Sequence, residues 1–342
     1  MKGAALVLAL LVTGCAPALT AADFARGPVR LDTGAAVPAP PVTMTYLGVG
    51  GWLIETPATA VLTAPLFSNP SIWRTGLLEI EADTVAIAEG LRTVGVTELS
   101  RVVAIVSGHA HYDHLMDVPW VAARQAARAR VLTNTTGVRT LAPAWSRLDL
   151  DPDRLVDLSS LAADVEGGGT RVPLGPDLRV LPVRSRHPPH FGGLELYDAS
   201  REAPLEREPR SASEWVGGDA LSFLFEVLDS SGSVVRRIYV QDAVSEGPYG
   251  FVPEGTDSVD VALLVPASFE EARWHPEAVM ENLRPRHVVL GHWEDFFEPV
   301  SVDPDPVPGT NLARFVERLR RALEGDESRW TLPVPGTRIE IR

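Results

Sequence analysis

The sequence predicts an α/β domain in which strands and helices form layers. Short runs rich in β-branched and apolar residues recur along the chain, and amphipathic helical segments lie between several of them. Strands that alternate with helices favour a layered α/β architecture. No short repeat and no second domain boundary follows residue 42, so we expect one folded domain.

The predicted elements are short. Strands are expected at residues 43–49, 52–55, 60–63, 102–107, 178–185, 221–227, 237–241, 259–264 and 287–290. Helices are expected at residues 83–94, 117–129, 275–283 and 309–324. The last helix is the clearest, because apolar residues recur in it at spacings of 3 and 4 behind a cap-like Thr310 and Asn311. The polar stretch 198–219 interrupts the strand pattern and predicts a long surface loop or lid.

The N-terminus has the layout of a bacterial secretion signal. Lys2 precedes an apolar run at 4–12, which is shorter than the roughly 20 residues of a membrane-spanning helix. Residues 11–15 resemble the lipobox cut by lipoprotein signal peptidase, which would leave Cys15 as a lipidated first residue. An ordinary signal peptide that contains a cysteine is the alternative. The lipobox reading predicts an exported protein, anchored in the bacterial cell envelope by its lipid.

The predicted domain organisation follows from this leader. Residues 1–14 are expected to be a lipoprotein signal peptide, and 15–41 an extended tether rich in Ala and Pro. Residues 42–342 are expected to form the folded domain. Cys15 is the only cysteine in the sequence, so this domain has no disulfide and no thiolate metal ligand. The formal net charge of −14 disfavours nucleic acid and anionic lipid as general electrostatic partners.

The strongest functional signal is a cluster of histidines and an aspartate. The apolar segment 101–107 predicts a buried strand and leads through Gly108 into His109, His111, Asp113 and His114. Ligands bind at the carboxyl ends of strands in open α/β sheets. Residues i and i+2 of an extended chain project from the same side, so His109 and His111 can share one metal. Asp113 and His114 follow where the chain turns toward a helix, and they can face a second metal.

The pattern His109-x-His111-x-Asp113-His114 resembles the signature of the metallo-β-lactamase superfamily, and the resemblance extends over most of residues 42–300. It implies an αβ/βα sandwich of two mixed sheets flanked by helices. It also implies two metal ions at one edge between the sheets, with further ligands after later strands. Zn²⁺ suits histidine and carboxylate ligands, and Fe²⁺ or Mn²⁺ would also fit.

The resemblance places the remaining ligands after later strands. His187 is the closer match for the third histidine of the first metal, because it comes first after its strand; His190 is the alternative. His190 would otherwise contact a ligand or face the substrate. Asp242 matches the aspartate that bridges both metals, and His292 matches the histidine that completes the second site.

Several neighbouring residues have open roles. Tyr112 and Trp293 flank the ligands and either line the substrate site or fill space, and residues 293–297 are expected to shape its rim. Asp117 either orients a ligand imidazole or caps the helix that follows it. The two histidines without this context, His275 and His287, are expected to be structural, at a helix start and a strand start.

Residues 45–55 and 60–65 are similar to the branch of ascorbate-phosphate lactonases and N-acyl phosphatidylethanolamine phospholipase D. That branch commonly has an acidic residue where this chain has Ala64. Support of a ligand by that carboxylate is therefore absent here or is supplied by another residue.

These observations predict a dinuclear metal hydrolase in which a metal-bridging hydroxide attacks an ester, lactone or phosphodiester bond. Asp113 is expected to orient that hydroxide and to take or pass on a proton. A small-molecule or lipid-like substrate would suit an enzyme anchored to a membrane. The alternatives are a β-lactamase-type amide hydrolase and a surface lipoprotein that binds metal without catalysis.

Overall fold

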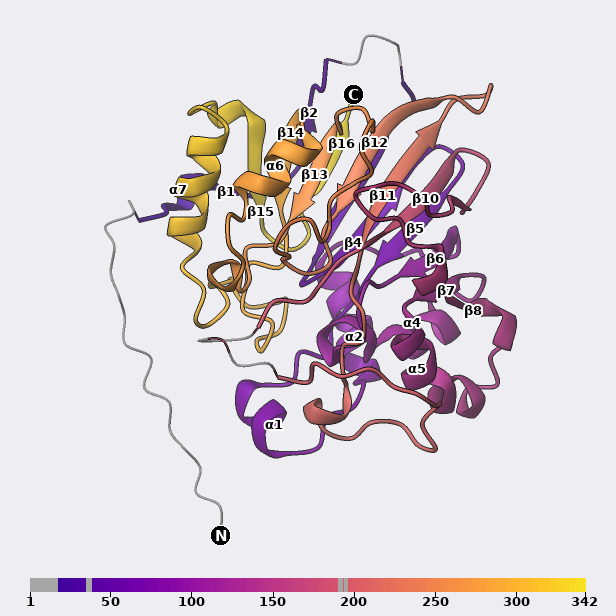
Figure 1. Cartoon of the computed structure of the whole chain (residues 1–342). Helices are drawn as coiled ribbons and strands as arrows, with labels where there is room; N and C mark the ends of the chain where they lie inside the picture. The colour runs from indigo at the N-terminus through magenta and orange to yellow at the C-terminus, as the bar shows by residue number, and fades with distance from the viewer. Residues whose placement is uncertain (1–17, 35–38, 190–192, 194–195) are drawn as a thin grey trace.

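The computed structural model describes residues 18–34, 39–189, 193 and 196–342. The predicted signal peptide, Cys15 and His190 lie outside these described residues. Two eight-stranded mixed sheets form the body of the molecule (Figure 1).

The first sheet contains the strands around the predicted histidine cluster. Its order is β2 (Val29–Leu31), β16 (Arg338–Ile341), β3 (Val42–Gly48), β4 (Gly51–Glu55), β5 (Ala60–Thr63), β6 (Val102–Val106), β7 (Arg130–Thr133) and β8 (Leu155–Asp157). The strands from β3 to β5 are antiparallel, whereas β5, β6, β7 and β8 are parallel.

The second sheet contains the strands that precede the later ligand candidates. Its order is β1 (Phe24–Ala25), β15 (Trp330–Pro333), β14 (His287–Leu290), β13 (Val261–Leu264), β12 (Val234–Val240), β11 (Leu221–Leu228), β10 (Leu178–Arg184) and β9 (Val172–Pro173). β12, β13, β14 and β15 run parallel, so their carboxyl ends meet at one edge.

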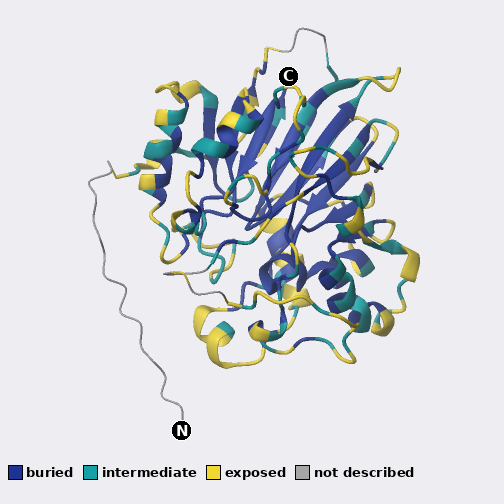
Figure 2. Cartoon of the chain, in the orientation of Figure 1, coloured by how far each residue is buried: buried dark blue, intermediate teal, exposed yellow. Residues whose placement is uncertain are grey.

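The alternation of side chains along the strands produces two apolar layers. Ile54, Val61 and Ala104 belong to the core that the first sheet shares with the second. Their neighbours Leu53, Leu62 and Ile105 face the opposite side and join a separate cluster. Since successive side chains of a strand point to opposite faces, strands buried on both faces must be apolar throughout. Both sheets are correspondingly buried in Figure 2.

Helices cover the outer faces of the sheets. α2 (Thr84–Thr93), α4 (Val118–Arg124) and α5 (Thr135–Arg147) lie beside the first sheet, and α6 (Glu277–Leu283) and α7 (Leu312–Ala322) beside the second (Figure 1). α1 (Ile72–Leu77) and α3 (Tyr112–Leu115) are short. In the part of the chain that the structure describes, no helix is long and apolar enough to cross a membrane.

The predicted fold class is confirmed, with helices outside two packed mixed sheets. The predicted tether at 15–41 is wrong for part of its length. β1 pairs with β15 and β2 pairs with β16, so residues 24–31 contribute strands to both sheets. Local composition could not reveal this, because the partner strands lie near the other end of the chain.

Other segments also differ from the sequence prediction. The helix expected at 117–129 ends at Arg124, and β7 begins at Arg130. The stretch 198–219 is a long connection, as predicted, but it is fixed to the body of the protein. Its Leu205 amide donates to the Arg139 carbonyl at 3.1 Å, and its Trp215 side chain is buried.

Replacement of Phe315 by alanine should destabilise the fold. Phe315 is fully buried on α7, and its ring packs against Phe269 with 5.2 Å between centroids. Phe315→Ala should lower the free energy of unfolding by about 3–5 kcal/mol, because the cavity it leaves cannot collapse fully. Urea denaturation would measure the change. The exposed neighbour Arg314 is the control, and Arg314→Ala should change the free energy by less than about 0.5 kcal/mol.

Candidate metal centre

The candidate ligands lie at the carboxyl ends of strands in both sheets. His109 and His111 follow β6, and Asp113 and His114 lie on the short helix α3 directly after it. In the second sheet His187 follows β10, Asp242 follows β12 and His292 follows β14. The structure therefore brings together ligand candidates that are separated by up to 183 positions in sequence (292 − 109).

Gly108 allows the two sheets to meet closely at this edge. Its carbonyl accepts a hydrogen bond from the Leu221 amide at 2.9 Å. A Cβ atom on Gly108 would lie 2.1 Å from the Leu221 carbonyl oxygen and 2.7 Å from Cβ of Asp242. Any larger residue would therefore push Asp242 and β11 away from the histidine cluster.

The ligand candidates form three overlapping groups. His109, His111 and His187 make the first, Asp113, His114 and His292 the second, and His109, His114 and Asp242 the third. Within each group the candidate ligand atoms lie within 4.8 Å of one another. The first two groups correspond to the two predicted metal sites, and the third shares a residue with each.

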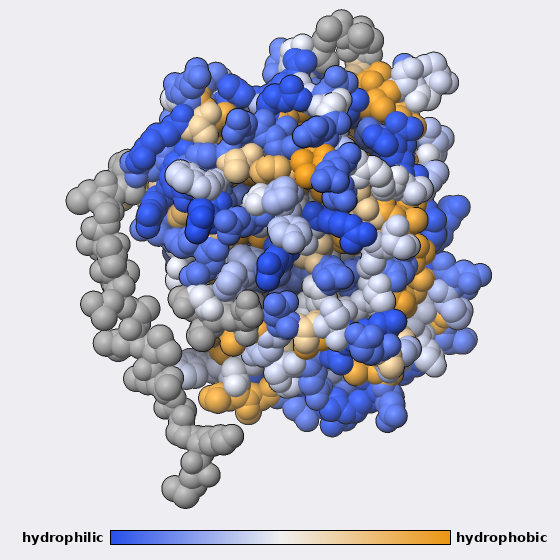
Figure 3. Space-filling model, in the orientation of Figure 1, coloured by the Kyte–Doolittle hydropathy of each residue, from blue (hydrophilic) through white to orange (hydrophobic). Residues whose placement is uncertain are grey.

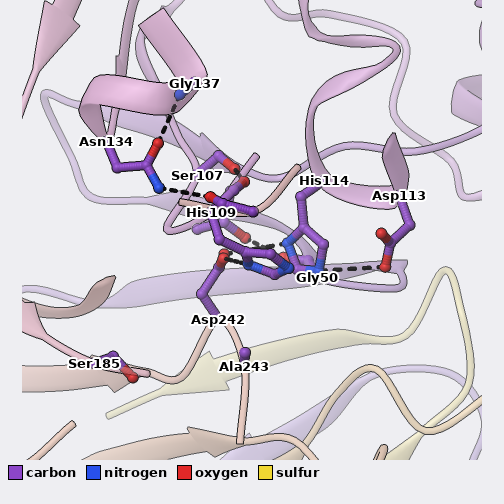
Figure 4. Close-up of polar contacts among 12 residues, drawn as sticks. Gly50, Ser107, His109, Asp113, His114, Asn134, Gly137, Ser185, Asp242 and Ala243 are labelled. Atoms are coloured by element: carbon purple, nitrogen blue, oxygen red, sulfur yellow. Dashed lines mark hydrogen bonds and ion pairs between the residues drawn. The ribbon is translucent and has the colours of Figure 1, made fainter. Parts of the chain in front are cut away.

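Asp242 is the link between the two sites. Its Oδ2 lies 2.6 Å from Nδ1 of His109, and its Oδ1 lies 3.3 Å from Nδ1 of His114. In Figure 4 its carboxylate points toward both imidazoles, and Asp113 reaches His114 from the other side. Oδ2 of Asp113 lies 3.5 Å from Nε2 of His114 and 3.3 Å from Nε2 of His292.

The electrostatics of the centre favour ionised carboxylates. Burial alone would raise the pKa of Asp242, but the adjacent His114 and His109 outweigh burial and hold this pKa far below its ordinary value. Burial is likewise outweighed at Asp113, where His114 and His292 hold the pKa well below the usual range. Burial and the nearby His114 lower the pKa of His109, so its imidazole is neutral at pH 7. Ionised carboxylates and neutral imidazoles are the forms that bind metal ions.

The buried nitrogen atoms also fit a metal centre. Nε2 of His109 and Nδ1 of His292 are buried and have no hydrogen-bond partner among the described residues. Buried polar atoms are normally hydrogen-bonded, because desolvation without a partner is costly. A bound cation would satisfy such lone pairs, so the residues present fit the metal ions that the resemblance implies.

His187 lies beside the two histidines of the first predicted site. Its ring centroid is 4.9 Å from that of His109 and 4.7 Å from that of His111. Its Nδ1 lies 2.7 Å from the Pro188 carbonyl oxygen, which fixes the orientation of the ring. His190 lies outside the described residues, so the choice between His187 and His190 stays a prediction.

His292 is held by two residues that the sequence analysis missed. Its backbone has a φ of +52°, which is uncommon for a residue other than glycine. The His292 amide donates to the Tyr46 hydroxyl at 2.7 Å, and that hydroxyl donates to the Glu294 carboxylate. The same carboxylate accepts from the Val49 amide. Tyr46 and Glu294 thus fix the turn that presents His292, but they are 248 positions apart and no local pattern connects them.

Asp117 serves neither of its predicted roles. Its side chain makes no cap bond to α4. Instead its carboxylate accepts from the amides of Phe67 and Ser68 at 2.7 and 2.9 Å, and from the Ser68 hydroxyl at 2.5 Å. Asp117 therefore fixes the loop after β5. Burial raises its pKa to about 6.

Ala64 lies beside the second site. It is fully buried, and a Cβ added to Gly50 would lie 3.2 Å from Ala64 Cβ and 2.8 Å from Cε1 of His114. With alanine at this position, the carboxylate near Nδ1 of His114 is that of Asp242, at 3.3 Å.

The aromatic residues beside the ligands divide into two kinds. Tyr112, Phe296 and Phe297 line the cavity that contains the metal ligands. Trp293 is fully buried and its Nε1 donates to the Pro333 carbonyl at 2.8 Å, so it is a packing residue. The predicted rim at 293–297 is therefore formed by its later residues.

The two histidines expected to be structural lie outside the centre. His275 is buried just before α6 and packs against Phe315, with 5.8 Å between ring centroids. His287 begins β14, and its Nε2 lies 2.8 Å from the Thr331 hydroxyl. Neither belongs to a group of candidate metal ligands among the described residues.

Replacement of Tyr46 by phenylalanine should weaken the second metal site. The change leaves the His292 amide and the Glu294 carboxylate without the hydroxyl that joins them. Loss of such a supporting contact typically lowers metal affinity about 10–100-fold. Chelator competition with Zn²⁺ would measure the affinity of each site, and the first site should change less.

Tyr239→Phe is the matched control. Its buried hydroxyl donates to the Gly250 carbonyl at 2.6 Å and has no bond to a ligand or to its backbone. The two variants should lose similar stability, about 1–3 kcal/mol. Equal losses of metal affinity in both variants would contradict a specific role for Tyr46.

The raised pKa of Asp117 predicts a pH-dependent stability. The carboxyl group binds its proton more tightly in the folded state, with a pKa of about 6 against an ordinary value of 3.8. Its stabilising contribution is therefore complete below pH 3.8 and is lost as the pH rises through 6. Asp117→Asn keeps the acceptor for the Phe67 and Ser68 amides and removes this titration.

Urea unfolding of the wild type and Asp117→Asn at pH 5 and pH 7.5 would test this prediction. The stability of the variant relative to the wild type should increase by about 1 kcal/mol between these pH values. A constant difference between the two proteins across this range would show that Asp117 titrates normally. Both proteins have the same metal ligands, so the comparison cancels their titration.

Comparison with protein-family models and with curated proteins gave no match. A crystal structure from Veillonella parvula, described as a possible metal-dependent hydrolase, superposes with a TM-score of 0.50 at 14% identity, over 88% of this chain and 99% of that chain. CmlA, a diiron β-hydroxylase from Streptomyces venezuelae, gives a TM-score of 0.50 at 16% identity, over 90% of this chain and 55% of that chain.

A protein from Thermotoga maritima, assigned as a Zn-dependent hydrolase of the metallo-β-lactamase superfamily, gives a TM-score of 0.38 at 10% identity, over 88% of this chain and 100% of that chain. At these identities the comparisons bear on the fold. Together with the topology of its two sheets, the two structures with a TM-score of 0.50 show that this chain shares with them a layered fold of two mixed sheets with helices outside.

Proposed function

We propose that this protein is a dinuclear metal-dependent hydrolase that cleaves an ester, lactone or phosphodiester bond. The observation that carries the proposal is the position of Asp242, whose two carboxylate oxygens lie beside histidines of both candidate metal sites. A carboxylate at this position can hold two ions at a fixed separation. Zn²⁺ is the first choice for this set of ligands, and Fe²⁺ and Mn²⁺ are the alternatives.

Each ligand residue has a defined part in this proposal. His109, His111 and His187 would hold the first ion, Asp113, His114 and His292 the second, and Asp242 both. Two bound ions would supply Lewis acidity and a hydroxide nucleophile near neutral pH. The ionised carboxylate of Asp113, which is buried at the cavity wall, can accept a hydrogen bond or proton from that nucleophile.

The cavity around the ligands favours a substrate with an apolar part. Besides the ligands, its wall includes Tyr112, Leu196, Val244, Val265, Phe296 and Phe297. Burial raises the pKa of Tyr112, so its phenol stays protonated and can donate a hydrogen bond to a substrate oxygen. A lipid-like ester or phosphodiester combines an apolar chain with oxygen atoms near the bond that is cleaved. The proposed lipid anchor at Cys15, in the cell envelope, would place the enzyme near such substrates.

The fold leaves other activities open, because proteins with this fold can differ in chemistry. The similar structure of CmlA is that of a diiron β-hydroxylase. Metal analysis and a substrate panel therefore belong in one experiment. Purified metal-replete protein should be assayed with phosphodiester, lactone, thioester and β-lactam substrates before and after chelation.

We expect turnover of an ester, lactone or phosphodiester substrate that chelation abolishes and Zn²⁺ restores. Hydrolysis of a chromogenic cephalosporin would instead favour the β-lactamase alternative. Two bound ions without turnover across the panel would favour a metal-binding lipoprotein.

Single substitutions in the centre should change the metal content. Wild-type protein should bind two equivalents of Zn²⁺. His109→Ala and Asp242→Ala should each reduce this number to one or fewer, because His109 belongs to two ligand groups and the Asp242 carboxylate lies beside histidines of both candidate sites. Elemental analysis after gel filtration would give the stoichiometry.

His287→Gln is the control for these variants. His287 is a buried histidine outside the centre, and glutamine can replace its hydrogen bond to Thr331. This variant should retain both equivalents. Retention of two equivalents by Asp242→Ala would contradict a shared ligand, and circular dichroism would show whether the variants remain folded.

A further inference from the structure

The surface of α1 carries an unusual group of exposed apolar side chains. Ile72, Trp73, Leu77 and the following residue Leu78 are 49%, 75%, 76% and 64% exposed. We call these four residues the α1 face. They form the hydrophobic area at the lower left of Figure 3, over the exposed helix in Figure 2. Large apolar side chains that cluster on the surface generally mark an interaction site.

The α1 face belongs to an ordered segment. The Ser71 hydroxyl accepts from the Arg74 amide at 3.4 Å and caps the helix. The Thr75 hydroxyl donates to the Pro70 carbonyl at 3.1 Å, and Ile80 after the helix donates its amide to the Arg210 carbonyl at 2.8 Å. These bonds fix the helix at both ends, so its apolar side chains are held outward.

α1 also borders the cavity of the candidate metal centre. Thr75, which lies between Trp73 and Leu77, lines that cavity together with Tyr112, Leu196 and Phe296. Leu196 is itself 37% exposed. The α1 face therefore lies at the rim of a cavity whose wall is largely apolar.

The chemistry of the segment fits the surface of a phospholipid bilayer. Tryptophan and leucine are typical of helices that lie in the interface between headgroups and acyl chains. Arg74 is the only cation between residues 71 and 78, and its Nε donates to the Glu79 carbonyl at 3.0 Å. Among the residues that the structure describes, Arg74 forms no ion pair, and Glu79, the nearest carboxylate in the sequence, pairs with Arg210 at 3.6 Å. The Arg74 guanidinium can therefore bind a lipid phosphate.

The charge around the segment indicates whether it would contact an anionic or a zwitterionic bilayer. Glu79, Glu81 and Asp83 follow the α1 face directly, and the whole chain has a net charge of −14. An anionic surface would repel this region, whereas a zwitterionic surface offers phosphate groups without net charge.

We infer that the α1 face inserts into the interface of a zwitterionic phospholipid bilayer and places the rim of the metal cavity against it. The inference rests on the proposed function in one respect. If the protein is a hydrolase, contact with the bilayer would let a lipid-like substrate pass from the bilayer into the cavity. Contact with the bilayer itself requires neither metal nor turnover.

Tryptophan quenching would test the contact. Full-length, chelator-treated protein is mixed with phosphatidylcholine vesicles whose acyl chains carry bromine atoms close to the headgroup. Bromine should quench the Trp73 fluorescence, and Trp73→Phe should remove most of the quenching. Trp274→Phe is the matched control, because Trp274 is 68% exposed and lies outside α1. It should retain the quenching of the wild type.

A second measurement addresses binding strength. In chelator-treated protein, Cys15→Ser, which removes the predicted lipidation site, is combined with the double change Leu77→Ser and Leu78→Ser or with Trp274→Ser. Vesicle flotation should show at least about tenfold weaker binding for the leucine variant, and no change for the tryptophan control. All variants keep the same N-terminal segment, so any difference between them reports on the exposed side chains.

Equal quenching in the wild type and Trp73→Phe would overturn the inference. Concentration-dependent self-association that the leucine variant loses, without vesicle binding, would also overturn it and would assign the α1 face to a second copy of the chain. Because the protein is metal-free in both measurements, failure of the proposed hydrolase activity would leave their outcome unchanged.

Discussion

The buried carboxylate of Asp242 is the interaction on which the centre depends. It comes from the second sheet, and the histidines that it contacts, His109 and His114, come from the segment after β6 in the first sheet. An isolated buried carboxylate would cost several kcal/mol, and that cost is offset only if charged or polar partners are correctly placed. The edges of the two sheets must therefore stay close, which explains why a Cβ at Gly108 would collide with both Asp242 and Leu221.

The second site depends on a different and more distant support. His292 has a left-handed backbone, a conformation that costs about 1–3 kcal/mol for residues other than glycine. Tyr46 and Glu294 bind this turn to the first sheet, just as Asp242 binds the second sheet to the histidine cluster. Each candidate metal site thus combines ligands from both sheets and is supported by contacts that join the two sheets. This reciprocal arrangement would transmit a disturbance at either sheet edge to both sites.

The sequence was sufficient to predict interactions that depend on local patterns. His109, His111, Asp113 and His114 lie within one short segment, and the later ligand candidates each follow a recognisable strand. Tyr46 and Glu294 could not be found in this way, because their contact joins distant parts of the chain. The role of Asp117 was missed for a similar reason, since its partners Phe67 and Ser68 lie on a preceding loop.

The α1 face was also missed in the sequence, although for another reason. An apolar residue in a sequence is normally assigned to the core, and only the three-dimensional packing shows that Trp73 or Leu77 points to solvent. The first and last strands of the domain were not predicted, because the sequence carries no local signal for them. β1 and β2 are two and three residues long, and they are defined by pairing with β15 and β16 rather than by their own composition.

The connection between β10 and β11 contacts His111, a candidate metal ligand that also lines two cavities. Its Gly217 carbonyl accepts from the Ala110 amide and from the Asn134 side chain, both at 2.9 Å, and a Cβ on Gly217 would lie 3.0 Å from Nε2 of His111. His111 and His187 line two cavities, the apolar one that contains the centre and a second one that includes Arg186 and Glu246. A change in this connection that alters the shape of either cavity would therefore also move His111. Under the proposed function, substrate range and affinity for the first metal should vary together in this protein, because the same backbone determines both.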